Sequence, residues 1–218
     1  MYLSGDLITL VLGLGALIYL IITLIKEKKG IYFQMIACAI GCHALSYLYD
    51  VCEILTMGTL SEGFSVGYLG VIGCYLFLLS ANYGCMDGII DDGTPAMAKS
   101  RKLAWIAPIV ATALYIVNFF AEVPFETKKY YFFVWIPAAI CSYYNLKHAL
   151  APDMGFGFIK AIRPFNLAAL AFNLLNLLHF TVWNYFEWQA ITVSGTLVGI
   201  ATVIMAVMAK RGVKRCTI

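Results

Sequence analysis

The stretch IYFQMIACAIGCHALSYLYDVCEIL (residues 31–55) decides the fold class, because it is long and apolar enough to cross a bilayer as one helix. Its polar side chains share one side of that helix at 100° per residue: His43, Ser46, Tyr47, Asp50 and Glu53. A charged side chain that faces lipid at a helix centre costs roughly 2.5–3.5 kcal/mol. We therefore expect this face to line the protein interior or a wet cavity.

The following apolar stretch, FSVGYLGVIGCYLFLLSANYGCMD (residues 64–87), predicts a second membrane-spanning helix. Tyr68, Tyr75 and Asn82 recur at intervals of seven residues and so lie on one face of it. Two neighbouring helices with facing polar stripes predict a solvated cleft between them.

The composition of the whole chain indicates an integral membrane protein. Of the 218 residues, 62% are hydrophobic and only 12% are charged, about half the charged fraction of a soluble domain. The first residues lack the cationic start of a secretory signal peptide, and residues 7–25 are long enough to span by themselves. We expect residues 1–218 to form a single all-α domain of the plasma membrane.

Hydropathy predicts seven spans, at about residues 7–25, 31–52, 66–86, 103–121, 130–147, 165–185 and 190–209. With this division, all of the 15 Lys and Arg residues except Lys128 and Lys129 fall on one side of the membrane. The positive-inside rule then predicts that the N-terminus lies outside and the C-terminus lies in the cytoplasm.

The last two predicted spans also carry polar or small residues with a regular spacing. Asn173, Asn176, His179 and Trp183 occupy about a third of the circumference of the span 165–185, and this face must look inward because Asn needs partners in hydrocarbon. In the span 190–209, the pattern Gly195-xxx-Gly199 predicts the close approach of a neighbouring helix.

Placing these polar groups by depth predicts one pocket that opens to the outside. Its lining is expected to comprise His43, Asp50, Glu53, Tyr68, Tyr75, Asn176, His179 and Trp183. Aromatic, amide and acidic groups together suit a small polar or amphipathic ligand, and Asn82 lies too deep to belong. Each residue also has a structural interpretation: solvation at a helix end for the acids, buried hydrogen bonds for His and Asn, and packing for Tyr and Trp.

Several functions are excluded by missing residues. The span 190–209 has no lysine for a retinal Schiff base, and the sequence has no Walker loop, dinucleotide fingerprint or nucleophile elbow. The three histidines form no HExxH motif, so neither a metal site nor another cofactor is expected. The basic residues mark one membrane face and predict no nucleic-acid binding. Five of the seven cysteines fall in or beside the spans, so no disulfide framework is expected.

Residues 36–120 resemble the seven-helix sensory module at the N-terminus of many bacterial histidine kinases and diguanylate cyclases. The similarity lies in SYLYDVCEIL (46–55), the Tyr-Leu-Gly of residues 68–70, LFLLSANYG (76–84) and the proline that opens the next span in IAPIV (106–110). For the last three spans it is a similarity of topology only. The resemblance implies a receptor-like sensor, whose output we expect in a separate cytoplasmic signalling protein.

A second resemblance is to the lysoplasmalogenase-like membrane hydrolases, which carry a Ser-x-x-x-Asp pattern in the second helix. Ser46 and Asp50 match this spacing. Those proteins usually have eight spans and a second intramembrane carboxylate in the C-terminal half, where this chain offers His179.

Three functions therefore stay open, with the sensor preferred. A sensor would bind a small ligand from outside and shift helices at the cytoplasmic face. A lipid hydrolase would use Asp50 or Glu53 with His43 or His179 as general acid and base. A small transporter would place its site between the polar helices. In each case the partners are membrane lipids and a small molecule. We expect a cationic or hydrogen-bond-donating ligand to pass the two acids and to contact His43, Tyr75 and Asn176, which draws the span 165–185 toward the span 31–52.

The predicted topology can be tested by labelling cysteines on intact cells. A cysteine that replaces Gly5 should react with an impermeant maleimide, whereas one that replaces Thr217 should react only after permeabilisation. Labelling of position 217 from outside would contradict the predicted orientation.

Overall fold

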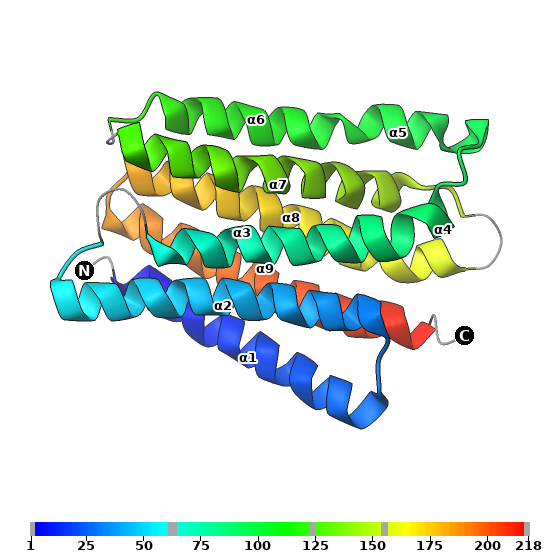
Figure 1. Cartoon of the computed structure of the whole chain (residues 1–218), viewed down its shortest axis with the longest axis horizontal. Coiled ribbons are helices and arrows are strands. Elements are labelled where there is room, and N and C mark those ends of the chain that lie inside the picture. Colours follow the sequence, from blue (N-terminus) through cyan, green and yellow to red (C-terminus); the bar gives the residue numbers. More distant parts are fainter. Residues whose placement is uncertain (1–2, 61–64, 123–124, 154–156, 216–218) are drawn as a thin grey trace.

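The computed structural model describes residues 3–60, 65–122, 125–153 and 157–215, and this part of the chain is helical without strands (Figure 1). Thr217, one of the two labelling positions, lies outside these residues. The helices are α1 (Leu3–Glu27), α2 (Ile31–Met57), α3 (Val66–Leu79), η1 (Ser80–Asp87), α4 (Gly88–Ile90), η2 (Pro95–Met97), α5 (Ala98–Ala104), α6 (Ile106–Phe119), α7 (Phe125–Leu150), α8 (Phe158–Tyr185) and α9 (Trp188–Arg215).

These elements form a bundle of long, roughly parallel and antiparallel rods (Figure 1). Among the described residues, six rods are long and apolar enough to cross a membrane: α1, α2, α3 to α4, η2 to α6, α8 and α9. Six such helices indicate an integral membrane protein. The other rod, α7, is as long as its neighbours and carries lysines near both ends, which lowers its hydropathy.

Two of the rods are not continuous α-helices. Helix α3 continues into η1, a π-helix, whose wider turn is rare and is often found at functional sites. Helix α5 ends at Ala104, four residues before Pro108, whose ring nitrogen has no hydrogen to donate to the Ala104 carbonyl. Both rods still run the length of the bundle (Figure 1).

Helix α8 begins seven residues earlier than the sequence predicts. Helix α8 starts at Phe158 instead of residue 165, because Lys160 and Arg163 lower the hydropathy of its first turns without opposing helix formation. The Arg163 guanidinium donates a hydrogen bond of 2.8 Å to the Ala151 carbonyl and so holds the start of α8 to the end of α7.

Small residues set the closest helix contacts. A methyl group at Gly70 of α3 would lie 2.7 Å from the Cys42 carbonyl oxygen of α2. On the other side of the bundle, one at Gly195 of α9 would lie 3.2 Å from the Gly5 carbonyl of α1, and one at Gly199 would meet Leu12 at 2.8 Å. The close approach predicted from the Gly195-xxx-Gly199 spacing is therefore confirmed.

Gly5 is also a tight position, since a methyl group there would lie 3.1 Å from the Ile191 carbonyl oxygen. A cysteine at Gly5 would thus disturb the packing of α1 on α9. Thr59 follows α2 at the same end of the bundle, is exposed, and makes the better labelling site for the topology experiment.

The packing of α2 against α3 can be tested by two matched substitutions. Gly70→Ala should lower the free energy of unfolding by roughly 1–3 kcal/mol, because the new methyl group meets the α2 backbone. Gly15→Ala, at an exposed site of α1 with nothing within 4 Å, should be neutral or stabilising. Thermal unfolding in detergent measures both, and equal melting temperatures would contradict the close α2–α3 contact.

Candidate functional site

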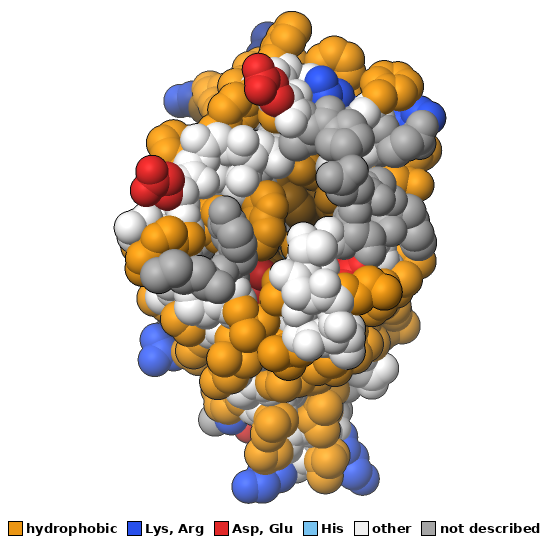
Figure 2. All heavy atoms as spheres, turned by 90° about the vertical axis from the view of Figure 1, so that its left-hand side faces the viewer, with side chains coloured by type: hydrophobic (Ala, Val, Ile, Leu, Met, Phe, Trp, Pro, Cys, Tyr) orange, Lys and Arg blue, Asp and Glu red, His pale blue; other side chains and the backbone are white. Residues whose placement is uncertain are grey.

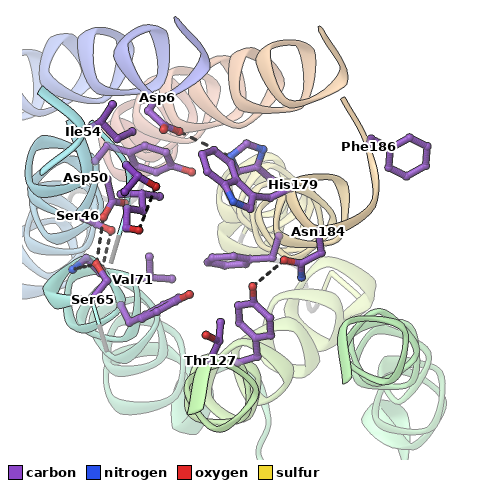
Figure 3. A pocket seen from close by; sticks show the side chains of 18 of the residues that line it. Asp6, Ser46, Asp50, Ile54, Ser65, Val71, Thr127, His179, Asn184 and Phe186 are labelled. Atoms are coloured by element: carbon purple, nitrogen blue, oxygen red, sulfur yellow. Dashed lines mark hydrogen bonds and ion pairs between the residues drawn. The ribbon is translucent and has the colours of Figure 1, made fainter. Parts of the chain in front are cut away.

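A pocket of about 450 Å³ opens at the end of the bundle where α2 ends and α3 begins. Figure 2 looks onto this end and shows a hollow in its surface with hydrophobic side chains at the bottom. The lining comes from five helices, α1, α2, α3, α7 and α8, and from the segments that follow α2 and α8 (Figure 3).

Four of the eight residues predicted for the site line this pocket: Asp50, Tyr68, His179 and Trp183. The other four do not. His43, Tyr75 and Asn176 are buried one layer further into the bundle, and each is at most 1% exposed. Glu53 is buried at the end of α2 and does not face the pocket.

The structure adds lining residues that the sequence analysis did not place in the pocket. The most important is Asp6 of α1, which is 3% exposed and points into the pocket (Figure 3). Tyr47, Ser65, Tyr131 and Asn184 join it. The available signal for Asp6 was an acid in a helix that carries no other charged residue before Lys26, but its place near the helix start suggested a solvated end.

Asp6 and His179 of α8 are neighbours in the pocket wall (Figure 3), with 4.0 Å between Asp6 Oδ1 and the imidazole Nε2. The other ring nitrogen, Nδ1, is 2.8 Å from the hydroxyl of Ser194 in α9. That hydroxyl donates its own hydrogen to the Ile191 carbonyl oxygen at 3.0 Å. With the Ser194 hydrogen on Ile191, His179 Nδ1 is assigned as the donor to Ser194, and Nε2 is the nitrogen that faces Asp6.

This assignment has two chemical consequences. The Ser194 hydroxyl accepts from His179, so the imidazole cannot act there as a general base, and Ser194 is not an activated nucleophile. Nε2 and the Asp6 carboxylate, in contrast, are both acceptors unless a proton is added. The pair therefore binds either one proton or the donor group of a ligand.

Asp50 is held toward the pocket by the start of α3. The Ser65 hydroxyl donates to Asp50 Oδ1 at 3.3 Å and accepts from the Gly67 amide at 3.1 Å, which caps α3. The Ser46 hydroxyl donates to the Gly67 carbonyl oxygen at 2.7 Å. A side chain at Gly67 would collide with the Asp50 carboxylate, so glycine leaves the space that this carboxylate occupies.

Aromatic rings form much of the remaining wall. Tyr68 lies edge-on to Tyr131, at 6.1 Å between ring centroids, and both rings lie near Phe180. The Tyr131 hydroxyl donates to Asn184 Oδ1 at 2.9 Å, and this bond joins α7 to α8 (Figure 3). The faces of such rings attract cations.

A buried polar layer closes the pocket from below. The Asn176 amide donates to the Tyr75 hydroxyl at 3.0 Å, and that hydroxyl lies 3.5 Å from the Asn173 carbonyl oxygen. The His43 ring packs edge-on against Tyr47 of the pocket wall and Phe172 of the core. This layer joins α2, α3 and α8 directly below the pocket.

The opposite end of the bundle carries an ionic cluster that the sequence did not predict. Asp87, at the end of η1, contacts Lys147 and lies 2.9 Å from His148 Nε2, both residues of α7. Asp91 lies 3.3 Å from both Lys147 Nζ and Arg101 Nε. The cluster thus ties the rod that begins with α3 to α5 and α7.

Asn82, which the sequence placed below the pocket, lies within η1 and is completely buried. Its amide donates to Asn145 Oδ1 of α7, so it adds a second link between the rod that begins with α3 and α7. Among the residues that the structure describes, no three His, Cys, Asp or Glu side chains come close enough together to bind a metal ion.

Comparisons with protein-family models, with curated proteins and with solved structures found no match to this chain. Fold and site by themselves define its class. It is an α-helical integral membrane protein with an acidic, aromatic pocket at one end of the bundle and an ionic cluster at the other.

The charge of the pocket can be tested with thiol reagents on Val71→Cys, a wall position, in a background without native cysteines. A cationic methanethiosulfonate should modify this cysteine about tenfold faster than an anionic one, because the carboxylates of Asp6 and Asp50 attract cations. Adding Asp6→Asn and Asp50→Asn should remove the preference. Leu78→Cys, fully buried below, should stay unmodified; its labelling at a similar rate would contradict the closed base.

Proposed function

We propose that this chain is a receptor-like protein of the plasma membrane that binds a small organic cation in the pocket and relays a helix shift to the opposite end. In this proposal the chain crosses the membrane seven times, with α7 as the span of lowest hydropathy. The N-terminus and the pocket lie outside, and the ionic cluster lies in the cytoplasm, as the distribution of Lys and Arg predicts.

The observation that carries the proposal is the combination of a buried acid, Asp6, a partly buried acid, Asp50, and an aromatic wall in one cavity. Asp6 and Asp50 supply negative charge, and the rings of Tyr68, Tyr131 and Trp183 supply polarisable faces. Pockets of this kind bind ammonium groups by ion pairing and cation–π attraction, and both are stronger where water is excluded. The volume of about 450 Å³ suits a small organic molecule.

The rod from α3 to α4 supports the relay. Its first turns contribute Ser65, Gly67 and Tyr68 to the pocket, and its far end contributes Asp87 and Asp91 to the ionic cluster. The π-helix η1 lies between them, and a wide turn of this kind can revert to α-helical geometry with a change of register. A ligand that favours one position of this rod would therefore alter the salt bridges to α5 and α7.

A separate cytoplasmic protein would read this change. The surface offered to it consists of the loop that joins α4 to η2 and the neighbouring start of α5, where Asp92 and Lys99 lie beside the cluster in the sequence. Both the partner and the orientation rest on the sequence pattern and the resemblance to sensory modules.

The contact between Asp6 and His179 favours a second candidate function, a membrane hydrolase of the lysoplasmalogenase-like type. A carboxyl group and an imidazole 4.0 Å apart, with Asp50 in the same cavity, can provide a general acid and a general base. Neither Ser46 nor Ser194 is free to act as a nucleophile, since each donates its hydroxyl hydrogen to a carbonyl oxygen. Hydrolysis would then proceed by direct attack of water.

Ligand binding can be measured by thermal shift with a set of primary and quaternary ammonium compounds. A ligand at a hundred times its Kd should stabilise the protein by about 2.7 kcal/mol. Asp6→Asn and Asp50→Asn should each weaken binding roughly tenfold or more, because each removes an ion pair with the ligand. Glu187→Gln, an exposed acid at the same end, is the matched control and should bind normally.

Asn176→Leu tests whether the polar layer below the pocket contributes to ligand binding. This change should lower the melting temperature without altering affinity, because Asn176 contacts Tyr75 and not the pocket. Ammonium binding that is insensitive to both acids would contradict the assigned site. Conversion of a bound lipid to products, followed by mass spectrometry and lost in Asp6→Asn, would favour the hydrolase over the receptor.

A further inference from the structure

We propose that the ligand is a single-chain amphiphile, with a cationic head in the pocket and a hydrocarbon chain in a groove between α3 and α7. This inference rests on the proposed function, because it extends the cation site to a specific class of molecule. It follows from a second cavity on the outside of the bundle, which shares one residue with the pocket.

The groove has a volume of about 430 Å³ and is almost entirely apolar. It is lined by Tyr68, Leu69, Ile72, Leu76, Leu79, Tyr130, Phe133, Ile136, Pro137 and Ile140. Several of these side chains, among them Leu69, Leu76 and Phe133, are about half exposed on the outer face of the bundle, which lies in hydrocarbon in a membrane protein. A hydrocarbon chain is therefore the chemistry that this surface fits.

The sequence gives a reason for a groove at this position. Pro137 of α7 has no amide hydrogen, so the Phe133 carbonyl loses its helical partner and the turn between them is open. Both residues line the groove. On the facing helix, α3, the lining residues from Tyr68 to Leu79 span about 16 Å at 1.5 Å per residue. This length accommodates much of one extended acyl or alkyl chain.

Tyr68 connects the two cavities, since its ring lines both of them. On the groove side it stacks on Tyr130, with 5.7 Å between centroids and 14° between planes. On the pocket side it meets Tyr131 and Phe180 edge-on or tilted. It is only partly buried, so a change of its side-chain rotamer opens a lateral path between pocket and groove without moving a helix.

The charges of the pocket determine which amphiphile can bind in the pocket and the groove together. The pocket side presents the carboxylates of Asp6 and Asp50, and none of the described residues that line either cavity is basic. Lys128 and Lys129, which follow the lining residue Thr127 in the sequence, lie over the rings of Phe119 and Phe125, respectively. An anionic lipid would be repelled, whereas a long-chain amine or quaternary ammonium amphiphile satisfies both cavities at once. One groove of this size holds one chain.

The test uses photo-crosslinking in phosphatidylcholine nanodiscs with a tetradecyltrimethylammonium probe that carries a diazirine in mid-chain. Crosslinks should concentrate on residues 69–79 and 133–140. An excess of butyltrimethylammonium, added before irradiation, should compete with the probe and lower their yield. The matched tetradecanol probe, which lacks the charge, should instead label the lipid-facing helices without preference. Mass spectrometry of the peptides gives the positions.

Two matched tryptophan substitutions test whether the groove binds the hydrocarbon chain. Ile72→Trp fills the groove and should lower its labelling about tenfold, yet leave the thermal shift by butyltrimethylammonium unchanged. Leu45→Trp, at an exposed apolar position of α2, is the matched control and should change neither readout.

Equal labelling patterns for the charged and uncharged probes would overturn the amphiphile assignment. The thermal shift by butyltrimethylammonium then decides whether the proposed function survives. If this compound stabilises the protein and Asp6→Asn removes the effect, the cation site is retained and only the site for the hydrocarbon chain is rejected. If it does not, the proposed function is rejected as well.

Discussion

The hydrogen bonds of the Tyr75 hydroxyl are the constraint on which the arrangement of the site depends. This group of α3 accepts from Asn176 and reaches the Asn173 carbonyl, both of α8, at positions about a hundred residues further along the chain. Inside a membrane protein no bulk water replaces a missing partner, and an unpaired polar group costs several kcal/mol. The pairing therefore fixes which faces of α3 and α8 meet, and the pocket forms directly above these faces.

The same rule explains why the rod that begins with α3 is held at both ends of the bundle. Its polar residues find partners on three other helices. Ser65, which caps α3, binds Asp50 of α2, Tyr75 binds Asn176 of α8 at mid-depth, and Asn82 and Asp87 of η1 contact Asn145 and Lys147 of α7. Its apolar side faces the groove and lipid. Polar contacts at several depths support the proposed relay, because a ligand that contacts Tyr68 would act on a rod that also reaches the ionic cluster.

Much of the fold could be predicted from the sequence, because hydropathy depends on residues close together in the chain. The spans around His43, Tyr75 and His179 all appear as helices, and the inward direction of their polar faces agrees with their burial. The Gly195-xxx-Gly199 contact was likewise visible as a local pattern. The start of α8 could not be predicted in this way, because Lys160 and Arg163 lower the mean hydropathy of its first turns.

The sequence by itself determined an all-helical membrane protein with polar faces on its second, third and sixth long helices. Only the tertiary structure decided which of those polar residues reach the pocket. Asp6 enters it because α1 packs tightly on α9 through Gly5 and Gly195, whereas His43 and Tyr75 lie one layer below. Helical periodicity gives the direction of a side chain around its own axis, but the tilt and depth of each helix arise from contacts between residues far apart in the chain.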